Sequence, residues 1–192
     1  MKKGERTKVL VIEKAIDLSF KEGWGQINFN KLAKLCNLSQ SAFYKYFKNK
    51  TDLMLHCQLH CAANGRDFID KYINNDEAAD IRLTSYIRGN LMWAKEHPSH
   101  VQMISSMYYF SNNNPPIHEV FKTITETGQG RIRSILLAGV REKIWQIDDL
   151  ELLVDLIHSY LVGKIIKASN DKDYFKDLNS SLLFISKLIK EH

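Results

Sequence analysis

Residues 28–50 contain two short apolar runs at helical spacing, separated by a polar break at residues 37–39. The first run places apolar residues at i, i+3, i+4 and i+7, which is one face of a two-turn helix. Its members are Phe29, Leu32, Ala33 and Cys36. The second run has Phe43 and Phe47 four residues apart. Asn28 and Ser39 stand just before the two runs, and both residue types are favoured N-caps. The spacing therefore predicts two short helices joined by a tight turn.

The opposite side of the second predicted helix is polar, aromatic and basic. Its members are Ser41, Tyr44, Lys45 and Lys48. Two helices joined by a turn of three or four residues, the first holding the second with its outer face turned away, can insert a helix into a major groove. The sequence thus predicts a helix-turn-helix that reads double-stranded DNA.

The order and spacing of these motifs resemble the tetracycline-repressor-like (TetR) family of bacterial regulators. The resemblance runs from about Val11 to Leu55 and covers VIEKAIDLSFKEGW, NFNKLAKLCNLSQSAFYKYF and KNKTDLML. Three departures from the family pattern alter which bases are read and leave the fold assignment unchanged. Lys45 stands where an aromatic residue or His is usual, Phe43 where Leu is usual, and Gln40-Ser41-Ala42 where Lys-Gly-Thr is common.

The resemblance implies roles for nine residues in DNA binding. The residues expected near base edges are Gln40, Ser41, Ala42 and Tyr44, with Lys45 as a further base or phosphate contact. The residues expected at the phosphate backbone are Asn28, Tyr46, Lys48 and Lys50. Gln side chains can pair bidentately with adenine, and Lys with guanine.

Charge is distributed unevenly along the chain. Residues 1–55 carry 11 Lys or Arg against 5 Asp or Glu, whereas residues 56–192 carry 16 against 17. A basic first quarter on a near-neutral remainder is typical of a nucleic-acid module joined to another domain. We therefore expect a DNA-binding domain at residues 1–49 and an effector-binding and dimerisation domain at residues 50–192.

The rest of the chain predicts an all-α fold of about nine helices. Helical periodicity extends over residues 5–22, 50–73, 78–97, 99–111 and 117–143, and again from residues 148 and 173. Asn112 to Pro116 reads as a loop, and Gly128-Gln129-Gly130 as an interruption of the seventh helix. The chain has no apolar run long enough to span a membrane and no signal-peptide pattern, and its three cysteines lack a disulfide framework. We therefore expect a cytoplasmic protein.

Two sets of residues point to further functions. A Met- and aromatic-rich set is expected either to line a small-molecule pocket or to be ordinary core; the resemblance places the effector pocket in this part of the chain. The candidates are Trp93, His97, Met103, Met107, Tyr108, Phe110 and Phe121. The last two predicted helices carry more apolar surface than a small core needs, and in the resembled family they form the dimer interface. The candidates are Leu153, Leu156, Ile157, Tyr160, Gly163, Leu178, Leu182 and Ile185.

The sequence predicts neither an enzyme nor a metal site. One predicted helix carries two histidines four residues apart, His56 and His60, and two cysteines four residues apart, Cys57 and Cys61. These side chains could be soft metal ligands, but one helix rarely brings more than two side chains onto one ion. No nucleophile with a base, phosphate-binding glycine loop or carboxylate cluster is evident, and no cofactor is expected. The favoured function is a ligand-responsive repressor that binds a palindromic operator as a homodimer. The alternative is a helical small-molecule-binding or protein-interaction module without sequence-specific DNA reading.

Overall fold

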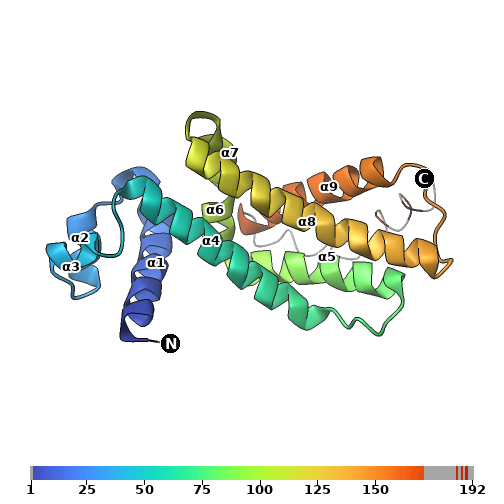
Figure 1. Cartoon of the computed structure of the whole chain (residues 1–192), viewed down its shortest axis with the longest axis horizontal. Coiled ribbons are helices and arrows are strands. Elements are labelled where there is room, and N and C mark those ends of the chain that lie inside the picture. The colour runs from blue at the N-terminus through green and yellow to red at the C-terminus, as the bar shows by residue number, and fades with distance from the viewer. Residues whose placement is uncertain (1, 171–184, 186, 188, 190–192) are drawn as a thin grey trace. The chain divides into compact units, whose positions relative to one another are not determined.

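A computed structural model describes residues 2–170 together with Ile185, Lys187 and Ile189. Every regular element in this part of the chain is a helix, which confirms the all-α prediction (Figure 1). The α-helices are α1 (Lys3–Glu22), α2 (Phe29–Leu35), α3 (Gln40–Tyr44), α4 (Lys50–Ile69), α5 (Ala79–Glu96), α6 (Pro98–Ser105), α7 (Met107–Phe110), α8 (Pro115–Arg141) and α9 (Leu150–Asn170). Three short 3-10 turns accompany them: η1 (Trp24–Gln26), η2 (Asp70–Tyr72) and η3 (Ser111–Asn113).

The chain forms two compact units. The first comprises Met1–Ala63 and Ser99–Phe121, and the second Asn64–Pro98 and Lys122–His192. Both α4 and α8 supply residues to each unit. This division by compactness differs from the predicted functional boundary between residues 49 and 50, which remains a prediction.

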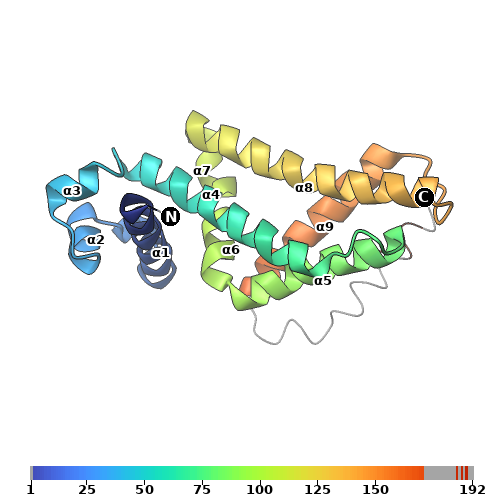
Figure 2. The same cartoon turned by 60° about the horizontal axis from the view of Figure 1, so that its bottom comes forward.

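Each unit has its own apolar core. In the first unit, α1, α2, α3 and α4 bury a cluster centred on Val11, Ile16, Leu32, Phe43 and Phe47, to which α6 adds Met103. In the second unit, α5, α8 and α9 bury Leu83, Ile87, Leu136, Leu153 and Ile157. Figure 2 shows α9 passing alongside α5 within that unit.

Side-chain N-caps are present at four helix starts, and they include the predicted caps Asn28 and Ser39. The Asn28 Oδ1 accepts the Asn30 N–H at 2.8 Å, and the Ser39 Oγ accepts the Ala42 N–H at 3.2 Å. The Asn49 side chain accepts from Asp52 N at 2.8 Å, and that of Asp149 from Leu152 N at 3.0 Å. Such bonds satisfy amide groups that a helix start otherwise leaves unpaired, so local sequence sets these boundaries.

The structure corrects three expectations about helix continuity. The helix predicted for residues 99–111 is broken at Ser106, whose Oγ donates to the Met103 carbonyl at 2.6 Å and so offers that carbonyl a local partner. Pro115 begins α8 instead of closing a loop, since proline at the first helical position loses no hydrogen bond. The helix also continues unbroken through Gly128 and Gly130.

Gly128 makes a close contact with a neighbouring helix, although α8 is not interrupted there. A Cβ atom on Gly128 would lie 3.1 Å from Nε2 of His158 on α9. The helix predicted to start near residue 173 lies outside the described residues, except for Ile185, Lys187 and Ile189.

Candidate nucleic-acid interface

The short helix α3 is held by aromatic contacts on its inner side. The Phe43 and Phe47 side chains are fully buried, and their ring centroids lie 5.6 Å apart. Phe29 on α2 lies 4.7 Å from Phe43, centroid to centroid. A helix of five residues is not stable alone in water, so these contacts hold α3 in place.

The turn between α2 and α3 depends on an asparagine in a left-handed conformation. Asn37 has a φ of 53°, a region that non-glycine residues seldom adopt but that Asn tolerates. The Leu38 N–H then bonds the Ala33 carbonyl at 2.9 Å, which closes the end of α2. The turn therefore brings Ser39 to its capping position at the start of α3.

The outer side of α3 is exposed, with Gln40, Ser41, Tyr44 and Lys45 facing solvent. Beside it lies an open hollow of about 400 Å³. We call it the α2–α3 hollow; its lining residues are Ile27, Asn28, Phe29, Asn30, Gln40, Tyr44, Lys48, Asn49 and Lys50. Five of the nine predicted DNA-contact residues thus line one surface: Asn28, Gln40, Tyr44, Lys48 and Lys50.

The other predicted contact residues lie at varied depths. Ser41 and Lys45 are exposed, whereas Ala42 and Tyr46 are half-buried. The Lys50 ammonium donates to the Gly25 carbonyl at 3.0 Å, so its position is fixed by the turn after α1. A Cβ atom on Gly4 would lie 3.9 Å from the Tyr46 hydroxyl, which puts the start of α1 beside the end of α3.

That proximity identifies basic residues that sequence reasoning passed over. Lys2, Lys3 and Arg6 flank Gly4 and are exposed. The excess positive charge of residues 1–55 includes these residues, but no individual DNA contact was predicted for them. The structure places this run next to Tyr46, where lysine and arginine suit phosphate contacts.

Comparison with known proteins agrees with this geometry. The family described as "Bacterial regulatory proteins, tetR family" matches residues 11–57. Residues 11–57 therefore form a DNA-binding domain of the TetR type, and the chain is a DNA-binding transcriptional regulator. Among curated protein sequences, none matches this chain.

Solved structures of TetR-family regulators share the fold at low sequence identity. A TetR transcription regulator from Haloarcula marismortui is 15% identical with a TM-score of 0.84, covering 96% of this chain and 97% of its own. The MbdR regulator from Azoarcus sp. CIB is 21% identical with a TM-score of 0.75, covering 93% and 96%. A tetR-family regulatory protein from Rhodococcus RHA1 is 17% identical with a TM-score of 0.75, covering 96% and 98%. At such identities the likeness establishes the fold.

The predicted pocket residues fall in both compact units. Trp93 and His97 belong to the second unit, where the Trp93 indole donates to Asn64 Oδ1 at 2.8 Å. Met103 and Met107 are buried in the first unit. The remaining candidates are the exposed Tyr108, the half-buried Phe110, and Phe121, whose ring contacts that of Tyr108 at 4.8 Å. Burial of Met103 in the first core fits the core interpretation, and the pocket remains a prediction.

Gln58 on α4 is a polar residue that sequence reasoning missed. Its side chain is fully buried, and within the described chain neither its amide oxygen nor its amide nitrogen has a hydrogen-bond partner. Buried polar groups are seldom left unsatisfied, so this amide is a candidate anchor for a bound molecule. A single Gln in an amphipathic helix gives no sequence signal of this kind.

The predicted dimer residues divide between core and surface. Leu153 and Ile157 are buried in the core of the second unit, as is Ile185. Leu156 is exposed, Tyr160 is half-buried, and Gly163 has no atom of the described chain within 4 Å of its Cβ position. Leu178 and Leu182 lie outside the described residues. Thus Leu156 and Gly163 can meet a partner, whereas Leu153 and Ile157 serve the chain's own core.

The His and Cys residues of α4 separate into different environments. Cys57 and Cys61 are buried in the first core, where burial, with the charge of Glu13, raises the pKa of each thiol. His56 lies 3.1 Å from the Lys8 ammonium, while His60 turns to Glu13 on α1. The four side chains therefore do not surround one point. His60 instead joins Glu13 and His100, a grouping that sequence spacing does not reveal because its members are 47 and 40 residues apart.

Proposed function

We propose that this regulator is a ligand-responsive repressor that binds a palindromic operator as a homodimer. The observation that carries the proposal is the outer side of α3, where Gln40, Tyr44 and Lys45 are exposed while Phe43 and Phe47 are buried behind them. A rigidly held helix with amide, phenol and ammonium groups outward suits direct reading of base edges.

The residues that line the α2–α3 hollow are proposed to divide into base contacts and phosphate contacts. Gln40 and Tyr44 lie on α3, whereas Lys48 and Lys50 lie on the segment that leads into α4. The proposed reading is that α3 enters the major groove and the lysines meet phosphates at its edge. Asn28, whose Oδ1 caps α2, would present the start of that helix to a phosphate.

An exposed apolar surface supports dimerisation through the second unit. Five apolar side chains of this unit are more than a third exposed. They are Leu137 and Val140 on α8, Ile144 in the turn after it, and Leu152 and Leu156, one helical turn apart on α9. The Arg133 guanidinium pairs with the Glu151 carboxylate, with Nε to Oε1 at 2.7 Å, so the two helices are adjacent here. Several exposed apolar side chains on two adjacent helices are typical of an interaction site. We propose that a second copy covers it, with residues 50–192 as the dimerisation and effector domain.

Effector binding is proposed for the Met- and aromatic-rich segment. Met107 is almost fully buried on α7, and the Tyr108 and Phe121 rings meet edge to face in the same unit. An apolar or aromatic molecule would suit these side chains, with Gln58 as a polar anchor. Such a molecule can alter DNA affinity only by binding two domain arrangements unequally.

The decisive experiment is selection of bound fragments from the source genome, followed by footprinting. A palindromic site with half-site centres roughly 34–36 Å apart would support a dimeric reader. Binding of all fragments alike, without enrichment, would contradict the proposal and favour a helical binding module that does not read sequence. A reporter fused to the selected site then gives the sign of regulation, and activation by the protein would refute the repressor assignment.

A further inference from the structure

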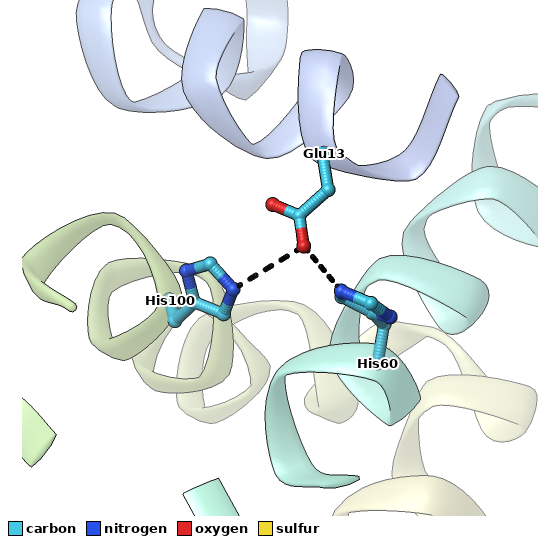
Figure 3. Close-up of side chains that lie close together, drawn as sticks. All are labelled: Glu13, His60 and His100. Carbon is cyan, nitrogen blue, oxygen red and sulfur yellow. Dashed lines mark hydrogen bonds and ion pairs between the residues drawn. The ribbon is translucent and has the colours of Figure 1, made fainter. Parts of the chain in front are cut away.

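Three side chains from three helices of the first unit converge at Glu13. Figure 3 shows the Glu13 carboxylate of α1 facing His60 of α4 and His100 of α6. The His60 Nε2 lies 2.5 Å from the Glu13 Oε1, and the His100 Nε2 lies 3.8 Å from the same oxygen. The ring centroids of the two histidines are 6.1 Å apart. All three donor atoms lie within 4.8 Å of one another.

This geometry points to a metal site. We propose that Glu13, His60 and His100 bind a divalent transition-metal ion of borderline softness, such as Zn²⁺, Co²⁺ or Ni²⁺. Two imidazoles and one carboxylate with further positions open is a donor set that such ions accept in proteins. Mg²⁺ and Ca²⁺ prefer oxygen donors throughout and do not fit two imidazoles.

The distances between the donor atoms suit an ion after small side-chain movements. Tetrahedral coordination with bonds of about 2.0–2.2 Å separates neighbouring donors by about 3.4 Å. The Glu13–His100 separation of 3.8 Å is already close to this value, while the Glu13–His60 hydrogen bond of 2.5 Å must open. The Glu13 side chain is 40% exposed and can rotate, so an ion would replace that hydrogen bond.

Exposure and charge also favour an ion at this place. The His100 side chain is 9% exposed and His60 24%, so the ion would be shielded on one side and reach solvent through Glu13. The neighbouring thiols of Cys57 and Cys61 are fully buried in the first core and do not belong to the group of three donor atoms that converge at Glu13. His56, one turn before His60, is instead engaged with Lys8 and Asp52.

A bound ion would fasten α1, α4 and α6 together within the first unit. Since α4 begins at Lys50, beside the α2–α3 hollow, occupancy of the site would set how firmly the DNA-reading helices are held. This regulatory role rests on the proposed function, whereas metal binding itself does not. By linkage, operator DNA would alter the metal affinity by the same factor as the metal alters DNA affinity.

The test of the site uses untagged, chelator-treated full-length protein titrated with Co²⁺ and Zn²⁺ in the absence of DNA. We expect one Co²⁺ per chain, with a visible absorption band of a low-coordinate site, and a rise in Tm of a few degrees with excess Zn²⁺. Removing a residue that only hydrogen-bonds to a metal ligand lowers metal affinity about 10–100-fold. Glu13→Gln and His60→Ala remove a ligand itself, so each should lower the Co²⁺ affinity at least about 100-fold. His100→Gln, which nearly keeps the ring's volume, serves as the variant for the buried ligand.

His56→Ala is the matched control, because it removes a histidine from the same helix without touching the three donors. It should bind Co²⁺ as the unaltered protein does. Equal losses for His56→Ala and His60→Ala, a sulfur-to-cobalt charge-transfer band, or no Co²⁺ binding at millimolar concentration would each overturn the proposed ligands. Circular dichroism of each variant checks that the helices remain formed.

A second measurement addresses regulation once the site is shown. Operator affinity with and without Zn²⁺ should differ by about 5- to 150-fold in the unaltered protein and not at all in Glu13→Gln. Equal affinities in the unaltered protein would overturn the regulatory role. Absence of any operator binding would instead contradict the proposed function, and the Co²⁺ titration would still decide the metal site.

Discussion

The Phe43 ring on α3 packs 4.7 Å from the Phe29 ring on α2, and Tyr44, the next residue along, is half exposed although its ring lies 5.5 Å from that of Phe29. One short helix thus turns an aromatic ring into the core and another outward. The inner ring holds the helix, and the outer one is available to DNA. The two functions can therefore be separated by substitution at adjacent positions.

Phe43→Ala should destabilise the fold and abolish DNA binding, because a fully buried phenylalanine is removed from the first core. The expected loss in the free energy of unfolding is about 3–5 kcal/mol, measured by urea denaturation. Tyr44→Ala is the matched control and should change stability little while weakening DNA binding. If Tyr44→Ala also unfolded the protein, the outward assignment of that ring would be wrong.

Gln40→Ala and Lys48→Ala should weaken DNA binding in different ways. Loss of a bidentate base contact should cost about 1–3 kcal/mol on the operator and relax its sequence preference. Loss of a phosphate contact should weaken all DNA alike and lower the salt slope by about one unit. Affinity measured on operator and random DNA over a range of salt separates these effects. Equal losses on both DNAs for Gln40→Ala would remove it from the base-reading set.

Leu156→Asp should give monomers with a folded core, whereas Leu153→Asp should unfold the chain. Leu156 is 37% exposed and Leu153 is 1% exposed, although both lie on α9 within one turn. Burying a charge at Leu153 has no compensating partner in the core, so that change disrupts folding. Sedimentation velocity with circular dichroism checks both outcomes. A folded dimer of Leu156→Asp would place the interface elsewhere.

Gly130→Ala should stabilise the protein, and Gly139→Ala should destabilise it, although both lie in α8. Among the described residues, no group outside the helix backbone lies within 4 Å of a Cβ on Gly130, so the helix gains up to about 1 kcal/mol from the lower entropy cost of alanine. A Cβ on Gly139 would overlap the Trp145 indole, which packs against the core of the second unit. Thermal melting of the two variants gives the comparison. Stabilisation by Gly139→Ala would show that Trp145 is free to move.

His158 should make the protein less stable as pH falls below neutrality. Burial lowers its pKa from the ordinary 6.5, with a smaller opposing effect of Asp155. The unfolded chain therefore binds a proton at a pH where the folded chain does not, so this stability is complete above about pH 6.5 and is lost as pH falls through the folded pKa. Urea midpoints between pH 7.5 and 5 should fall less in His158→Gln than in the unaltered protein. Burial also lowers the pKa of His56, which adds a slope of the same sign and needs its own His56→Gln control.

Local sequence determined the helix-turn-helix almost completely. Its signals act within a few residues, so they can be predicted without knowledge of the fold. They are the N-caps Asn28 and Ser39 and the four-residue spacing of Phe43 and Phe47. The family resemblance added roles for the exposed residues of α3, which no local rule supplies. The sequence predicted a break between the helices at residues 37–39 but not the left-handed conformation of Asn37, because that φ depends on how Leu38 closes α2.

The tertiary structure alone decided what depends on residues far apart in the chain. Leu153 and Leu156 look alike on an apolar helix, and only the packing of α5, α8 and α9 sends one into the core and leaves the other exposed. The meeting of Glu13, His60 and His100 depends likewise on how α1, α4 and α6 pack. Periodicity tells which side of a helix is apolar, but the partner of each side is set by the sum of all contacts in the folded chain. Sequence therefore determined the DNA-reading helices, and the tertiary structure decided which apolar residues stay exposed and which polar groups meet.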